Sequence, residues 1–162
     1  MSENTDEISR LIESTIRVIC TGDYNVGQSC FLKKWIDDTF EEQESTGGCA
    51  TLTKNIKHNN FDYVLNLWDI GGHSKFYKLK PAFYRGTKDL VFLFFDLTNR
   101  DSFINLSNHI EHIKKVGKTD FQIITIGTKI DLIDENSVPN ILDSELDAFA
   151  DKYNSDIILT TS

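Results

Sequence analysis

Short apolar runs rich in β-branched residues alternate with segments of helical periodicity, and this alternation restricts the possible folds more than any other feature of the chain. The expected strands are residues 15–21, 51–57, 61–69, 89–96, 121–128 and 157–160, and the expected helices are residues 30–37, 78–86, 101–115 and 139–152. Strands that alternate with helices form a sheet that is covered on both faces. The sequence therefore predicts an α/β domain with a mostly parallel sheet and helices on both faces.

Two neighbouring strands are expected to pair antiparallel. Only His58, Asn59 and Asn60 separate residues 51–57 from residues 61–69, and asparagine tolerates the positive φ that a tight hairpin turn requires. We expect this hairpin to place one antiparallel strand at the edge of the sheet.

Length, charge and cysteine content narrow the class of protein. With 162 residues, 40% of them hydrophobic, the chain can bury one core without a disulfide or a metal. Its three cysteines are irregularly spaced, which favours packed thiols in a reducing compartment. A net charge of −8 repels phosphate backbones, so nucleic acid is not an expected partner.

We place the domain at residues 15–162, after an N-terminal extension of residues 1–14 that either docks as a helix or frays.

The turn after the first expected strand has the frame of a phosphate-binding loop. Gly22 and Gly27 are separated by four residues and followed by Gln28 and Ser29, between a strand and a helix. Backbone N–H groups and the helix N-terminus of such a loop converge on an anion. The motif requires lysine in place of Gln28, and a charged hydrogen bond contributes about 1.5–3 kcal/mol where a neutral one contributes about 1 kcal/mol. By itself the fragment is equally compatible with a tight turn that binds no ligand.

Further motifs follow this loop in a recognisable order. They are QESTGG, LWDIGGH, the long run FYRGTKDLVFLFFDLTNRDSF, GTKIDL and the closing TTS. In this order they resemble the two switches, the second-switch helix, the base-recognition box and the last nucleotide loop of the Ras superfamily of small GTPases, most closely its Rab branch. The resemblance spans nearly the whole chain. It implies the P-loop NTPase fold of a small-GTPase G domain, with GTP or GDP and Mg²⁺ as cofactors.

The resemblance also assigns a nucleotide site. The residues implied in nucleotide binding are Gly22, Asp23, Tyr24, Asn25, Val26, Gly27, Gln28, Ser29, Cys30, Phe40, Thr46, Gly72, Thr128, Lys129 and Asp131. The residues implied as Mg²⁺ ligands are Ser29, Thr46 and Asp69. Asp131 would accept hydrogen bonds from the guanine N1 and N2 hydrogens, which rejects adenine, or else it caps a helix. Phe40 would lie edge-on against the guanine, or it is a plain core contact.

This chain departs from the family pattern at the positions that take part in GTP hydrolysis. His73 replaces the glutamine that orients the attacking water, so it is the candidate catalytic residue, and hydrolysis is expected to be slow. The alternative is that His73 is a solvent-facing switch residue. Tyr24 occupies a place where small residues leave room for an arginine finger, so it is expected to obstruct an activating protein.

Two functions are compatible with these residues. The first is a Rab-like GTP/GDP switch in vesicle trafficking with slow or impaired hydrolysis, read by effector and exchange-factor proteins through its two switch segments. The second is a pseudo-GTPase that keeps the fold as an interaction module. The sequence stops at Thr161–Ser162, before the helix that closes the sheet in this superfamily, and it carries no lipidation cysteine at that end. We therefore expect a cytoplasmic protein whose attachment to vesicle membranes depends on parts outside this chain.

Overall fold

The computed structural model describes residues 15–38, 47–59, 61–73, 75, 78–85, 89–116, 119–134 and 140–161. Every structural statement below concerns these residues. The expectations for residues 1–14, Phe40, Thr46, Gly86 and Pro139 lie outside them.

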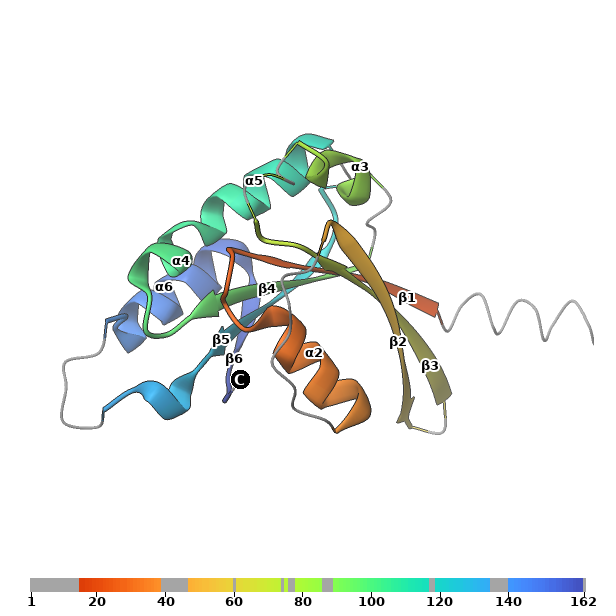
Figure 1. Cartoon of the computed structure of the whole chain (residues 1–162), viewed down its shortest axis with the longest axis horizontal. Helices are drawn as coiled ribbons and strands as arrows, with labels where there is room; N and C mark the ends of the chain where they lie inside the picture. The colour runs from red at the N-terminus through yellow and green to blue at the C-terminus, as the bar shows by residue number, and fades with distance from the viewer. Residues whose placement is uncertain are drawn as a thin grey trace, which may run out of the picture.

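A six-stranded sheet with the order β2-β3-β1-β4-β5-β6 forms the centre of the molecule (Figure 1). Its strands are β1 (Thr15–Gly22), β2 (Cys49–His58), β3 (Phe61–Ile70), β4 (Leu90–Asp96), β5 (Gln122–Thr128) and β6 (Ser155–Leu159). The β2–β3 pair is antiparallel, closed by a turn in which Asn59 has a φ of 49°, and the other neighbouring pairs are parallel. The predicted sheet, mostly parallel with one antiparallel edge strand, is confirmed.

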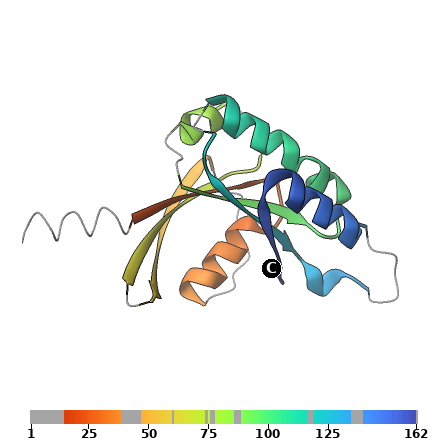
Figure 2. The ribbon, with the colours of Figure 1, turned by 180° about the vertical axis from the view of Figure 1, so that it is seen from behind.

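Helices cover both faces of this sheet, as predicted. They are α2 (Gln28–Asp37), α3 (Lys80–Tyr84), α4 (Arg100–Ile104), α5 (Leu106–Val116) and α6 (Asp143–Tyr153), with a short 3₁₀ helix η2 (Ile130–Leu132). In Figure 2, α2 lies on one face, and α4, α5 and α6 lie on the other. The loops that follow β1 and β5 at the carboxyl ends of these strands carry the GDYNVGQS and GTKIDL motifs, which is where open α/β sheets place ligands.

The helix expected over residues 101–115 is divided into α4 and α5 at Asn105. Asn99 caps α4, because its side chain accepts a 3.1 Å hydrogen bond from the Asp101 N–H. The Asn105 carbonyl accepts from both Asn108 and His109, which tightens the turn between the two helices. Periodicity alone could not reveal this division, because both helices present their apolar residues to the same core.

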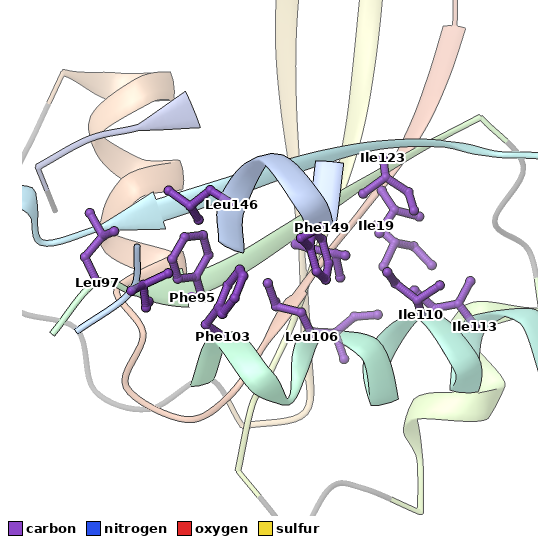
Figure 3. Close-up of a cluster of buried hydrophobic side chains, with 14 of the residues drawn as sticks. Ile19, Phe95, Leu97, Phe103, Leu106, Ile110, Ile113, Ile123, Leu146 and Phe149 are labelled. Carbon is purple, nitrogen blue, oxygen red and sulfur yellow. The ribbon is translucent and has the colours of Figure 1, made fainter. Parts of the chain in front are cut away.

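Two apolar cores stabilise the two faces. The larger lies between the sheet and the helices α4, α5 and α6, where Phe95, Phe103 and Phe149 form successive ring contacts of 5.3 and 5.5 Å (Figure 3). The smaller lies under α2 and includes Leu32 and Cys20. Burial of each large apolar side chain contributes about 1.5–3 kcal/mol. Burial also raises the pKa of the Cys20 thiol well above its usual value, as suits a packed, unreactive cysteine.

Candidate functional site

The loop between β1 and α2 folds into a cradle of backbone N–H groups. Asn25 and Gly27 take the left-handed conformation, with φ angles of 63° and 80°, and this turns the chain sharply into α2. Gly22 is required by close packing, since a Cβ there would lie 2.5 Å from the Phe94 carbonyl oxygen. The unsatisfied N–H groups at the start of α2 therefore open at the mouth of this loop.

A cavity of about 110 Å³ lies in front of the loop. It is lined by Asp23, Tyr24, Asn25, Val26, Gly27, Gln28, Ser29, Cys30, Asp69, Ile70, Gly71, Gly72 and His73. The structure thus brings the predicted phosphate loop together with the end of β3 and the start of the second-switch segment. Residues that are about forty positions apart in the sequence share one cavity.

Gln28 lines this cavity, but its side-chain amide donates to acceptors within the protein. Its side chain is buried, and Nε2 donates to the Cys20 carbonyl at 3.0 Å, the Ile70 carbonyl at 3.3 Å and Asp69 Oδ1 at 2.5 Å. A buried amide takes the strongest acceptors within reach, and here these are a carboxylate and two carbonyls. Gln28 therefore ties the start of α2 to the end of β3.

The second oxygen of Asp69 is also engaged. Ser29 Oγ donates to Asp69 Oδ2 at 2.7 Å, so two of the three predicted Mg²⁺ ligands lie side by side. A hydroxyl and one carboxylate, with the rest of the shell supplied by phosphate and water, is a usual donor set for Mg²⁺. The donor chemistry of Ser29 and Asp69 fits the ion, while Thr46 lies outside the described residues. The described residues contain no cluster of three His, Cys, Asp or Glu side chains that would form a metal cage without a phosphate.

The GTKIDL segment is bonded directly to the phosphate loop. Thr128 Oγ1 donates to the Val26 carbonyl at 2.6 Å, and Lys129 Nζ donates to the Asn25 carbonyl at 2.8 Å. Lys129 also pairs with Asp96 at 2.8 Å. Burial acts to raise the pKa of Asp96, but hydrogen bonds from Lys129 and Thr98 outweigh it and lower that pKa.

Asp131 follows this anchored pair on η2 and is exposed. The single-turn helix η2 follows the anchored Lys129, so it lies beyond the carboxyl end of β5, beside the phosphate loop. The arrangement joins the candidate base-recognition segment to the candidate phosphate-binding loop.

Comparison with known proteins agrees with this geometry. The family model for the Ras family matches residues 17–161. The chain belongs to the Ras family. Its curated relatives include human Ras-related protein Rab-22A, 26% identical over 91% of this chain and 74% of the relative. They also include yeast GTP-binding protein YPT53, 36% identical over 84% and 62%, and human Ras-related protein Rab-31, 31% identical over 76% and 64%. The matched region thus spans less than two thirds of YPT53 and of Rab-31.

In this Ras-family chain, the second-switch segment rests directly on the phosphate loop. A Cβ on Gly72 would lie 2.4 Å from the Asp23 carbonyl oxygen, so only glycine permits this approach. Next to it, the rings of Tyr24 and His73 meet edge to face, with centroids 5.3 Å apart. Tyr24 is 58% exposed, so the pair stands at the open side of the cavity.

His73 has one ring nitrogen engaged by the backbone. The Lys75 N–H donates to His73 Nδ1 at 3.2 Å, which leaves the proton of the neutral imidazole on Nε2. In this state Nε2 is a hydrogen-bond donor, and the one ring lone pair, on Nδ1, is already engaged by the Lys75 N–H. A donor can orient a water or a phosphate oxygen, whereas a general base must accept a proton.

Sequence reasoning missed the residues that support the loop from behind. Asp23 Oδ1 accepts hydrogen bonds from Asn105 Nδ2 at 2.7 Å and from His109 Nε2 at 2.9 Å. Burial acts to raise the pKa of Asp23, but these two hydrogen bonds lower it. Lys80 of α3 is buried, and its Nζ lies 3.5 Å from the Gly22 carbonyl. The sequence does hold a signal for these two residues. Asn105 and His109 are polar, and their spacing of four places them together on the otherwise apolar face of residues 101–116.

Proposed function

We propose that this Ras-family chain is a Rab-like guanine-nucleotide switch with slow GTP hydrolysis. The observation that carries the proposal is the hydrogen bond from Lys129 to the Asn25 carbonyl, because it fixes the base-recognition segment to the phosphate loop. This bond within the protein holds both halves of a nucleotide site in one arrangement, and such preorganisation reduces the entropy cost of binding. The Rab names of the relatives support a role in vesicle trafficking, with the protein in the cytoplasm at the surface of vesicle membranes.

Each segment has its own part in the proposed switch. The loop 22–29 binds the phosphates through backbone N–H groups, Ser29 and Asp69 hold Mg²⁺, and Asp131 reads the guanine edge. Bound Mg²⁺ neutralises part of the phosphate charge. In the proposed switch the second-switch segment changes position between the two nucleotide states, and its contact with the phosphate loop is Gly72, which packs against the Asp23–Tyr24 backbone. Effectors and exchange factors would distinguish these positions.

A second candidate is an interaction module that does not turn over nucleotide. The observation in its favour is the uncharged Gln28, whose amide is bonded to Asp69 and two carbonyls.

None of the helices in the described ranges has the length and hydropathy that a membrane-spanning helix requires.

Isothermal titration of nucleotide-free protein separates the two candidates. GDP and GTP are expected to bind, more tightly with Mg²⁺ than with EDTA, and ATP is expected to bind much more weakly. Equal affinity for ATP would contradict the assignment of Asp131. No heat with any nucleotide, in a protein that is shown to be folded by circular dichroism, would support the interaction module.

Gln28→Lys is expected to tighten GDP binding by about tenfold or more, because a cation near phosphates gains more than an amide does. The lysine would also find Asp69 and the two carbonyls within reach, so it need not be unpaired. The measurement is the dissociation constant for GDP. Gln28→Met is the matched control, since it removes the same amide without adding charge. A gain in both variants would trace the effect to release of Asp69, and a loss in the lysine variant would contradict the charge argument.

Single-turnover GTP hydrolysis is expected to be slow and to rise about tenfold or more in His73→Gln, because an amide offers both a donor and an acceptor to the attacking water. Tyr24→Gly is expected to leave the intrinsic rate unchanged and to matter only with an activating protein present. His58→Gln, at the exposed end of β2, is the control for a histidine far from the cavity. A wild-type rate that changes with pH in the range where histidine titrates would instead make His73 the catalytic group.

A further inference from the structure

Lys80 is a buried cation that has no part in the nucleotide binding proposed above. It is 3% exposed, and no other lysine in the described part of the chain is buried. Lysine is almost never fully buried unless it is paired, because desolvation of an ammonium group is costly. The ammonium group of Lys80, which lies on α3 in the second-switch segment, therefore requires a partner within the protein.

The partners of Lys80 belong to the phosphate loop. Nζ donates to the Gly22 carbonyl at 3.5 Å, and the Asp23 carboxylate attracts the ammonium group. The Asp23 carboxylate also accepts hydrogen bonds from Asn105 and His109, so His109 of α5 is the next titratable group in this cluster. The cluster fixes the first peptide group of the loop between α3 and α5.

A second buried contact joins the same helix to β1. One turn after Lys80, the hydroxyl group of Tyr84 shares a 3.0 Å hydrogen bond with that of Thr21. Thr21 and Gly22 are consecutive, so α3 is attached at two successive positions to the point where β1 becomes the loop. A movement of α3 is thereby transmitted to the loop backbone.

The peptide geometry shows what Lys80 does to the loop. In a trans peptide the C=O and the following N–H point in opposite directions. Because the Gly22 carbonyl points to Lys80, the Asp23 N–H is turned away from Lys80. Asp23 lines the cavity and Lys80 does not, so the ammonium group lies behind the loop.

We propose that Lys80 is a positioning residue for the nucleotide phosphates, which orients the Gly22–Asp23 peptide from behind the loop and supplies the positive charge that Gln28 does not. This inference rests on the proposed nucleotide binding. It gives the second-switch helix a direct effect on phosphate affinity.

The charge of Lys80 depends on pH within an accessible range. Burial lowers its pKa to about 8, although the Asp23 carboxylate acts against this. Phosphates bound in front of the loop favour the charged form, so nucleotide binding takes up a proton as the pH approaches 8. The affinity for nucleotide therefore falls as the pH rises from 7 to 9.

The experiment compares wild type, Lys80→Met, Lys80→Arg and the exposed control Lys78→Met by GDP titration in EDTA at pH 7, 8 and 9. Lys80→Met is expected to bind GDP about tenfold or more weakly at pH 7, with less of the fall at high pH. Lys80→Arg is expected to keep the affinity at pH 7 and to lose less of it by pH 9, because guanidinium stays charged. Ionisation of the base affects all variants alike.

The outcomes separate this inference from the proposed function. If wild type binds no guanine nucleotide, both fail. If wild type binds GDP and Lys80→Met shows the same affinity and pH profile, only the role of Lys80 fails. An independent readout is the amide nitrogen shift of Asp23 in nucleotide-free protein, which is expected to titrate near pH 8 in wild type and to be flat in Lys80→Met. A flat profile in wild type would overturn the inference even where nucleotide binds.

Discussion

Asp131→Ala is expected to weaken GDP binding by at least about a hundredfold, or about 3 kcal/mol. A carboxylate that accepts two N–H groups of guanine forms two charge-assisted hydrogen bonds, each of which contributes about 1.5–3 kcal/mol. Alanine leaves both donors of the bound base without a partner. The measurement is isothermal titration with GDP at fixed Mg²⁺. Because Asp131 is exposed on η2, the melting temperature is expected to stay unchanged.

Asp131→Asn provides the matched control. Asparagine keeps one acceptor and adds a donor, so it suits a base whose C2 amino group is replaced by a carbonyl. The asparagine variant is therefore expected to lose GDP and to gain xanthosine diphosphate. An alanine variant that binds GDP as tightly as wild type would show that Asp131 caps η2 and does not read the base.

Lys80→Met is expected to stabilise the nucleotide-free protein by up to about 3 kcal/mol at pH 7. Burial lowers the pKa of Lys80 from 10.5 to about 8, and each pKa unit corresponds to about 1.4 kcal/mol. The sign follows from proton binding. Below pH 8 the folded protein carries a buried charge that the unfolded chain exposes to water, and between pH 8 and 10.5 only the unfolded chain is protonated, so wild-type stability rises with pH there.

Urea unfolding of both proteins at pH 7 and pH 9.5 measures this difference. The gain from methionine is expected to shrink at the higher pH, because wild type no longer buries a charge. Asp23 keeps its hydrogen bonds to Asn105 and His109 in the variant, so it is not left unpaired. A methionine variant that is less stable at pH 7, or a difference that is independent of pH, would contradict the argument. The exposed Lys78→Met is expected to change stability little.

Most of the architecture could be predicted because it depends on local patterns. The apolar runs at Leu90–Asp96 and Gln122–Thr128 are unambiguous, and the hairpin turn at Asn59 has the predicted positive φ. The division at Asn105 could not be read from periodicity, since the apolar residues of both helices pack into the same core. The helical repeat of a sequence does not reveal helix boundaries that depend on tertiary contacts.

The candidate site shows the same limit at the level of single side chains. The sequence places Gln28 at the loop, but its direction depends on Asp69 and Ile70, which are distant in the chain. Lys80 was missed because lysine in a short amphipathic segment is usually a solvated residue. Its spacing of four from Tyr84 was the available signal, since that spacing places both side chains on one face of a helix. Phe40 and Thr46 stay predictions, because they lie outside the described residues.

The central position of β1 has a consequence for synthesis on the ribosome. Thr15 pairs with Val64 of β3, and Val18 pairs with Leu90 of β4, so both partners of β1 are made well after it. The hairpin of β2 and β3 can close as soon as it is made, because its contacts are local. The apolar side chains of β1 therefore stay exposed until β3 and β4 have emerged from the ribosome. Slow synthesis of the segment between β1 and β4, once β1 has left the ribosome, would prolong that exposure and increase aggregation of the nascent chain.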